Sequence, residues 1–124
     1  MSHISGKNTK PEIVIRKLVH QLGYRFRLHK KELPGKPDLV FPKYQKVIFI
    51  NGCFWHHHKN CSRSTLPTTN KKFWKEKIEG NVKKDKSNYR QLRKIGWDYL
   101  VIWQCQIKKS NTEKLINKIL NFLS

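Results

Sequence analysis

The organisation of this chain is set by one segment, which reads Val47-Ile48-Phe49-Ile50-Asn51-Gly52-Cys53-Phe54-Trp55-His56-His57-His58-Lys59-Asn60-Cys61. It joins a short apolar run to a glycine turn that carries two aromatic residues, three histidines and two cysteines. Imidazoles and thiols need a hydrogen-bond partner, a metal or water when they are partly buried, so a turn crowded with them has few purely structural uses. We therefore interpret this turn as the functional site and the rest of the chain as its support.

The size and charge of the chain indicate one nucleic-acid-binding domain. Its 124 residues suffice for a single core, and we expect a flexible basic arm over residues 1–8 and one domain over residues 9–124. Lys and Arg number 27 against 8 acidic residues, a formal charge of +19. Nucleic acid is favoured over an anionic membrane surface as the partner, because no basic helix with an apolar membrane face stands out. With no 18-residue apolar run and no signal peptide, we expect a cytoplasmic protein that does not enter a membrane.

Turn residues and hydrophobic periodicity predict helices and strands in the order α-β-β-β-α-β-α. The helices are expected over residues 9–22, 70–94 and 112–123, and the strands over residues 24–28, 38–41, 46–51 and 97–105. This order is typical of an α/β fold, a mixed sheet flanked by helices. The second and third strands are close in sequence and should pair as an antiparallel hairpin, which brings Asp38 near Ile50 and Asn51.

The crowded turn contains candidate ligands for a structural metal. Cys53, His58 and Cys61 lie within nine residues, and Cys105 completes a Cys3His set if its strand lies beside the one that leads into the turn. Such a closed set suits tetrahedral zinc, and it would tie two strand ends together. An odd number of cysteines without a secretory signal argues against disulfides. His57 is an alternative to His58, and the alternative to a metal is three core cysteines beside a solvated histidine run.

A second group of residues predicts phosphodiester hydrolysis. If zinc takes His58, His56 is left free at the same turn. Asp85 lies on the otherwise apolar stripe of the long helix, where it would either hold an imidazole or pair with a surface lysine. Held by Asp85, His56 could act as a general base. Asp38, at the mouth of an apolar strand, suits Mg2+, which binds through carboxylates and substrate phosphate.

Four further residues admit two interpretations each. Glu12 completes the Thr-x-x-Glu spacing of a capping box that begins at Thr9, so it either caps the first helix or serves the site. Phe54 and Trp55 in the turn, with Trp74 at the head of the long helix, either pack in the core or wedge between stacked bases.

Several motifs follow one another along nearly the whole chain. They are Asn8-Thr9-Lys10-Pro11-Glu12, Gly23-Tyr24-Arg25-Phe26-Arg27-Leu28-His29, Leu33-Pro34-Gly35-Lys36-Pro37-Asp38, Gly52-Cys53-Phe54-Trp55-His56, Phe73-Trp74-Lys75-Glu76-Lys77-Ile78, Asn81 with Asp85, and Trp103-Gln104-Cys105. Together they resemble the very-short-patch repair (Vsr) DNA mismatch endonucleases, and the Gly-Cys-Phe-Trp-His motif is highly specific. The resemblance implies a restriction-endonuclease-like fold. It also implies a Mg2+-dependent nick made 5′ to the thymine of a T·G mismatch, the product of 5-methylcytosine deamination.

The resemblance also implies roles for individual residues. Asp38 and the main-chain carbonyl of Ile50 would bind Mg2+, with Glu12 as an auxiliary acid near the metal. His56 would be the catalytic base, supported by Asp85. The remaining matches are the zinc ligands Cys53, His58, Cys61 and Cys105, the intercalating aromatics Phe54, Trp55 and Trp74, and a DNA contact at Asn81.

The chain departs from the family pattern in three places and from the pattern of the wider fold superfamily in one. Asn51 stands where the family usually has a second histidine, and an amide can bind a phosphate or water but cannot carry a proton. The interval from His58 to Cys61 is one residue longer than the common His-x-Cys, and the amino-terminal arm is shorter than usual. The strand over residues 46–51 also lacks the Glu-x-Lys pair of the wider fold superfamily, which makes the histidine-based chemistry more necessary.

The resemblance implies double-stranded DNA with a T·G mismatch as the substrate, and mismatch-repair proteins and a cognate cytosine-5 methyltransferase as partners. We expect a monomer in the bacterial cytoplasm, associated with the nucleoid when bound to DNA. The alternatives are a zinc-stabilised nucleic-acid-binding module without catalysis and a nuclease of the same fold that cuts matched DNA. A binding module does not predict an acid in an apolar stripe together with a free histidine and an acid that opens a strand.

Overall fold

The computed structural model describes residues 10–28, 32–56, 58 and 65–124. The helices are α1 (Lys10–Gln21), α2 (Lys71–Lys94) and α3 (Thr112–Leu123), and the strands are β1 (Arg27–Leu28), β2 (Leu39–Phe41), β3 (Lys46–Asn51) and β4 (Asp98–Trp103). Two 3-10 turns, η2 (Gln104–Gln106) and η3 (Lys109–Asn111), connect β4 to α3. The described elements therefore follow the predicted order. The predicted arm over residues 1–8 and the Thr9 cap lie outside the described residues.

The four described strands form one mixed sheet in the order β1-β2-β3-β4. β1, β2 and β3 are antiparallel neighbours, and β4 runs parallel to β3. In this register Leu39 lies opposite Ile48, and Asn51 lies opposite Trp103. The start of β2, the end of β3 and the end of β4 consequently meet at one end of the sheet, which is where the predicted functional residues are concentrated.

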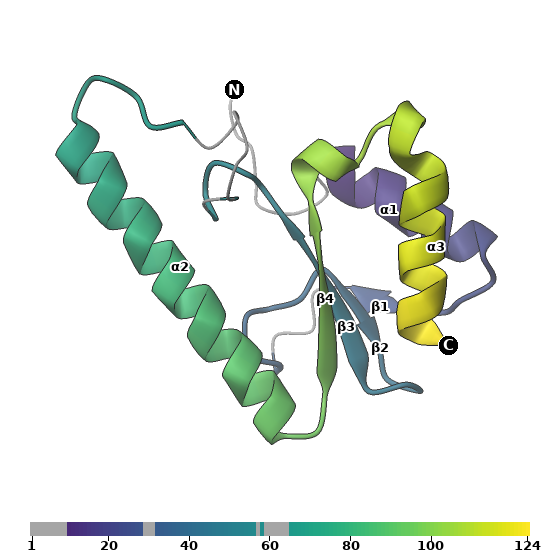
Figure 1. Cartoon of the computed structure of the whole chain (residues 1–124). Helices are drawn as coiled ribbons and strands as arrows, with labels where there is room; N and C mark the ends of the chain where they lie inside the picture. Colours follow the sequence, from purple (N-terminus) through teal and green to yellow (C-terminus); the bar gives the residue numbers. More distant parts are fainter. Residues whose placement is uncertain (1–9, 29–31, 57, 59–64) are drawn as a thin grey trace.

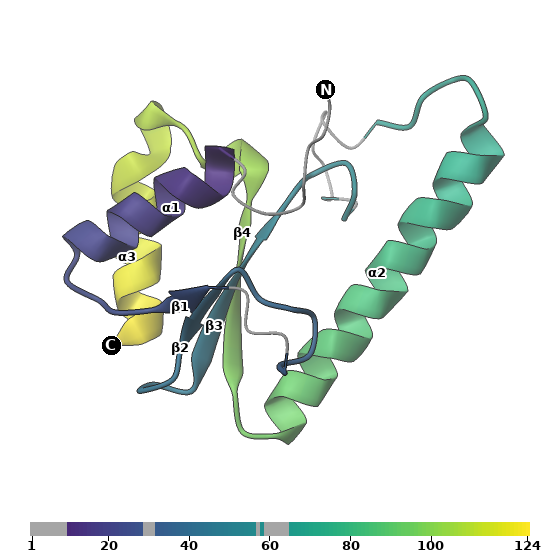
Figure 2. The same ribbon diagram turned by 180° about the vertical axis from the view of Figure 1, so that it is seen from behind.

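Helices cover both faces of the sheet, with α1 and α3 on one face and α2 on the other (Figures 1 and 2). Strand alternation assigns each apolar residue to one of the two faces. Ile48 of β3 joins Ile15 and Ile119 in a large buried cluster beneath α1 and α3. Phe49 joins Leu92 in a smaller cluster beneath α2. The mixed sheet flanked by helices is thus confirmed.

The long helix α2 packs on the sheet through its C-terminal half and diverges from it toward its N-terminal end (Figure 1). Leu92, near the C-terminal end, is fully buried, whereas Asp85 and Trp74 are only partly buried. The predicted inward stripe is present, and the divergence leaves its middle facing the segment that follows β3. No described helix is long and apolar enough to span a membrane.

Two predicted strands are shorter than expected. The strand expected over residues 24–28 is limited to Arg27 and Leu28, because the rings of Tyr24 and Phe26 pack on Tyr44 and Phe41 instead of extending the edge of the sheet. The strand expected over residues 97–105 ends at Trp103, whose backbone N–H donates to the side-chain oxygen of Gln106 at 3.0 Å. Cys105 therefore lies in η2, just beyond the strand.

Candidate active site and metal centre

A histidine–carboxylate pair joins the turn after β3 to the middle of α2. His56 Nδ1 lies 2.6 Å from Asp85 Oδ2, and the two side chains are 29% and 21% exposed. The backbone N–H of His56 donates to the carbonyl of Gly52 at 3.1 Å, which fixes the turn that presents the ring. An imidazole that donates through Nδ1 leaves Nε2 as the acceptor. Asp85 thus faces an imidazole, which was the first of its two interpretations.

Two carboxyl groups meet at the start of β2. Asp38 Oδ2 accepts a 2.6 Å hydrogen bond from the backbone N–H of Ile50, and Glu12 of α1, which is buried, hydrogen-bonds the Asp38 carboxyl group. Burial, followed by the hydrogen bond with Glu12, raises the pKa of Asp38 to about 8, while the Ile50 N–H opposes the rise. A carboxyl pair that is costly to ionise is a fitting place for a cation, which removes the penalty on both charges.

The backbone of Ile50 completes this set of oxygens. The N–H and C=O groups of one residue in a strand point to the same edge. Because the Ile50 N–H points at Asp38, its carbonyl oxygen is directed to the same side. Glu12, Asp38 and the Ile50 carbonyl are hard oxygen ligands, so their chemistry fits Mg2+.

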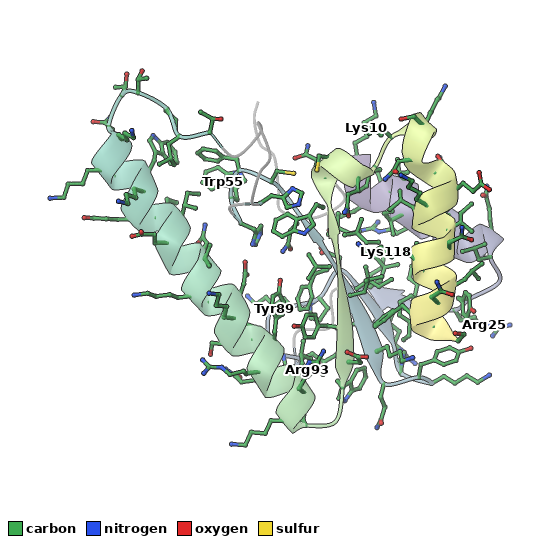
Figure 3. All side chains as sticks on the ribbon, in the orientation of Figure 1. Lys10, Arg25, Trp55, Tyr89, Arg93 and Lys118 are labelled. Carbon is green, nitrogen blue, oxygen red and sulfur yellow. The ribbon has the colours of Figure 1, made fainter. Side chains whose placement is uncertain are left out.

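Tyr89 of α2 lies close to both the His56–Asp85 pair and the Asp38 carboxyl group. Asn51, only 4% exposed, donates from Nδ2 to the Tyr89 hydroxyl oxygen at 3.2 Å. Burial raises the pKa of Tyr89 to about 12, the charges of Asp85 and Asp38 add to the rise, and the Asn51 hydrogen bond opposes it. Both carboxylates are therefore close enough to act on one phenol, which Figure 3 shows directed from α2 toward the sheet. Tyr89 follows Asp85 by four residues on the same stripe of α2, and its hydroxyl was the signal in the sequence of a polar role.

Three side chains cluster where the ends of β3 and β4 meet. One ligand atom from each of Cys53, His58 and Cys105 lies within 4.8 Å of the others, and Cys105 Sγ is 3.3 Å from His58 Nδ1. Tetrahedral zinc would place a sulfur and a nitrogen ligand about 3.6 Å apart, so this cluster fits a metal ion. The ring of Trp103 stacks on that of His58 with centroids 4.3 Å apart. The predicted ligand Cys61 and the alternative His57 lie outside the described residues.

Aromatic rings gather between the turn after β3 and the start of α2. Trp74 lies at centroid distances of 5.6 Å from Phe54, 5.7 Å from Trp55 and 5.1 Å from Phe73. Trp55 is 46% exposed and Phe73 is 56% exposed. Lys77 Nζ lies 6.0 Å from the ring centroids of both Trp55 and Phe73. Trp55 and Phe73 are therefore more exposed than rings that only pack in a core. Phe73 was not among the predicted site residues, although the Phe-Trp pair at a helix start was the signal that could have identified it.

Asn81, predicted to contact DNA, makes a contact within the protein. Its Nδ2 donates to the main-chain carbonyl of Trp55 at 3.0 Å. The amide thereby holds the aromatic turn against α2, one turn before Asp85 holds His56. Figure 3 shows Trp55 on this turn, beside the N-terminal half of α2.

Known proteins resemble this chain over most of its length. A family model described as DNA mismatch endonuclease Vsr matches residues 1–63. The type II nicking enzyme V.XorIIP of Xanthomonas oryzae pv. oryzae is 46% identical over 107 residues, which are 86% of this chain and 78% of that protein. The type II nicking enzyme V.NmeAIP of Neisseria meningitidis serogroup A is 41% identical over 120 residues, or 96% of this chain and 85% of that protein. The DNA mismatch endonuclease Vsr of Escherichia coli K12 is 38% identical over 120 residues, or 97% of this chain and 75% of that protein.

Proposed function

This chain belongs to the Vsr family of DNA mismatch endonucleases, and from that premise we propose that it nicks one strand of duplex DNA 5′ to the thymine of a T·G mismatch. The reaction is hydrolysis of one phosphodiester bond. The single observation that carries the proposal is the His56–Asp85 pair, at 2.6 Å, at the end of the sheet where Asp38 also lies.

The histidine supplies the base. Asp85 accepts the Nδ1 proton of His56, which leaves Nε2 to take a proton from the attacking water as its oxygen bonds to phosphorus. The bond from phosphorus to the leaving sugar oxygen breaks in the same displacement. The carboxylate orients the imidazole and stabilises the imidazolium that forms, so the two residues act as one unit.

The carboxyl pair would hold the cation. Asp38 and the Ile50 carbonyl are the proposed Mg2+ ligands, with Glu12 beside them. When bound, Mg2+ neutralises the charge that develops on the phosphate and the leaving oxygen. Asn51 adjoins Ile50 and would contribute hydrogen bonds to the phosphate or the water, since its amide cannot exchange a proton.

The substrate duplex would be bound by charge and by stacking. A formal charge of +19 attracts the phosphate backbone at any sequence. Phe54, Trp55 and Trp74 would insert beside the mismatch, where a weakened stack is less costly to open. Asn81 would support this insertion by holding the Trp55 carbonyl.

The cysteine–histidine cluster would hold structural zinc. Cys53 and His58 follow β3, and Cys105 follows β4, so a shared ion would join the ends of two neighbouring strands. Cys61 is proposed as the fourth ligand. The ion would fix the turn that carries His56, without taking part in the reaction.

A nicking assay with strand-specific labels tests this function. Wild-type protein should nick only the thymine strand of a T·G duplex, in Mg2+ and not in EDTA, and should leave the same duplex intact when T·A replaces T·G. Asp38→Ala and His56→Ala should bind the duplex but not nick it. His20→Ala, which removes an exposed histidine of α1, is the matched control and should nick normally.

The two alternatives give different results in this assay. A wild-type protein that binds the mismatch but does not nick would indicate a binding module, and equal nicking of the T·A duplex would indicate a nuclease for matched DNA. We also propose mismatch-repair proteins and a cognate cytosine-5 methyltransferase as partners of a monomer in the bacterial cytoplasm. A panel of T·G duplexes with varied flanks would identify the preferred context, which depends on side chains at the groove edges.

A further inference from the structure

Asn51 of β3 and Tyr89 of α2 form a side-chain hydrogen bond beside the proposed catalytic residues. Asn51 is the last residue of β3, adjacent to Ile50, and it is almost fully buried. Its Nδ2 lies 3.2 Å from the hydroxyl oxygen of Tyr89, which comes from α2, 38 positions along the chain. In the part of the chain that the structure describes, Tyr89 is the side-chain partner of this buried amide, and such a partner sets the orientation of the amide.

Tyr89 itself is held by rings on two sides. The ring of Phe49 meets it edge-on with centroids 5.2 Å apart, and the ring of Tyr99 stacks on it at 4.4 Å and an interplanar angle of 12°. Phe49 lies two residues before Asn51 on the same face of β3, and Tyr99 lies on β4. The hydroxyl is therefore a fixed point on the sheet side of α2.

We propose that Tyr89 is a positioning residue for the nicking reaction: its hydroxyl fixes the Asn51 amide, so that one N–H and the carbonyl oxygen of that amide are presented to the scissile phosphate and the attacking water. This inference rests on the proposed function. An amide has two N–H donors and one carbonyl acceptor, and the contact with Tyr89 uses one donor only.

The neighbouring charge explains why the amide binds through nitrogen and not through oxygen. Asp85 lies one helical turn before Tyr89; burial is the main cause of the raised pKa of Tyr89, and the negative charge of Asp85 adds to it by favouring the protonated hydroxyl. The hydroxyl proton is drawn toward negative charge, which leaves an oxygen lone pair for Asn51 Nδ2. A flipped amide would place its carbonyl oxygen against that lone pair. The charge of Asp85 thus favours the amide orientation in which Asn51 Nδ2 donates to the Tyr89 hydroxyl.

This arrangement also explains how an asparagine can serve at a position where the family usually has histidine. A histidine can contribute by moving a proton, whereas an asparagine contributes only by where its donors and acceptor point. Orientation is useful in catalysis when it is fixed before the substrate arrives. Tyr89 supplies that fixation through a single hydroxyl group.

Two matched substitutions separate the hydroxyl from the ring. Tyr89→Phe keeps the packing against Phe49 and Tyr99 but removes the hydroxyl, and Tyr99→Phe makes the same chemical change in the stacked partner. We expect Tyr89→Phe to lower the single-turnover nicking rate on a T·G duplex about 10-fold, the usual effect of one neutral hydrogen bond. The duplex Kd and the Tm of the protein should stay near wild type, and Tyr99→Phe should nick at the wild-type rate.

A double-mutant cycle shows whether the effect passes through Asn51. In an Asn51→Ala background, Tyr89→Phe should have no further effect on the nicking rate, because the group it positions is absent. A fall of similar size in both backgrounds, or a wild-type rate for Tyr89→Phe, would overturn the inference while the proposed function stands. A wild-type protein that does not nick the T·G duplex would overturn the proposed function and this inference with it.

Discussion

On the face of the sheet covered by α1 and α3, buried aliphatic side chains from both helices meet those of three strands, whereas the face covered by α2 changes from apolar to polar along the helix. Near the C-terminal end of α2, Leu92 packs on Val47 and Phe49. Toward the N-terminal end of α2, Tyr89 contacts Asn51 of the sheet, and Asp85 contacts His56 of the turn after β3. Figures 1 and 2 show the helix diverging from the sheet over the same interval.

The difference can be traced along β3, whose side chains alternate between the two faces. Ile48 and Ile50 point to the large cluster beneath α1 and α3. Val47 and Phe49 point to α2, and the next residue on that face is Asn51, at the level where the helix is leaving the sheet. One face thus carries the larger buried cluster, and the other carries the polar residues of the site. Substitutions on the two faces should accordingly change different quantities.

Loss of the metal cluster should have the largest effect on stability, because the proposed ion joins the turn after β3 to the end of β4. Structural zinc contributes on the order of 10 kcal/mol in small zinc domains, so Cys105→Ser should abolish cooperative unfolding and the bound metal together. Metal analysis of the wild-type protein should give one zinc per chain. Cys105→His, which retains a zinc ligand, should recover part of both. A wild-type protein without zinc, or a Cys105→Ser variant with an unchanged Tm, would contradict the prediction.

The catalytic pair should affect rate without affecting stability. Asp85→Asn removes the carboxylate that orients His56, and we expect the single-turnover nicking rate to fall by about 10²- to 10⁴-fold, the range attributed to general bases. Asp98→Asn, at the exposed start of β4, is the matched control and should leave the rate unchanged. The Tm and the duplex Kd should be similar in all three proteins. A rate loss below about threefold in Asp85→Asn would indicate that another group accepts the proton.

On the face covered by α1 and α3, a substitution should lower stability without changing the nicking rate. Ile119 of α3 is fully buried in the large cluster, and Ile119→Ala should lower the free energy of unfolding by about 2–5 kcal/mol. Urea denaturation measures the loss, with the exposed Asn117→Ala as the control on the same helix. The rate per folded molecule should not change, because Ile119 lies in the cluster on the face of the sheet opposite the His56–Asp85 pair. A rate that falls as far as in Asp85→Asn would show that the two faces are not independent.

Local patterns predicted most of the fold, because helix stripes, strand alternation and hairpin spacing are properties of neighbouring residues. The hairpin pairing predicted that Asp38 lies near Ile50, and the acid in the stripe of α2 gave an imidazole as one of the two expected partners of Asp85. Glu12 could not be assigned this way. Its capping pattern is local, but its contact with Asp38 depends on how α1 packs.

The contact of Asn51 with Tyr89 was not predicted for the same reason. A tyrosine in an apolar stripe has the same pattern as a packed ring, and only the third dimension shows what its hydroxyl meets. The end of β4 was also misplaced. Trp103 and Cys105 continue an apolar run, but the strand ends first, where the backbone N–H of Trp103 donates a hydrogen bond to the side-chain oxygen of Gln106. Side-chain competition of this kind is not visible in hydrophobic periodicity.

The aromatic cluster gives the smallest expected effect, and it tests whether the outer end of the α2 face serves the substrate. Trp55→Ala should weaken binding to a T·G duplex by about 1–3 kcal/mol, the range for one lost base-stacking ring, measured by fluorescence anisotropy at fixed salt because the protein is highly charged. Ile95→Ala removes an exposed apolar side chain just beyond the other end of α2 and should leave Kd unchanged. The matched T·A duplex should lose less affinity than the T·G duplex, since its intact stack resists insertion. Equal losses on the two duplexes would show that Trp55 contributes general contact area and not recognition of the mismatch.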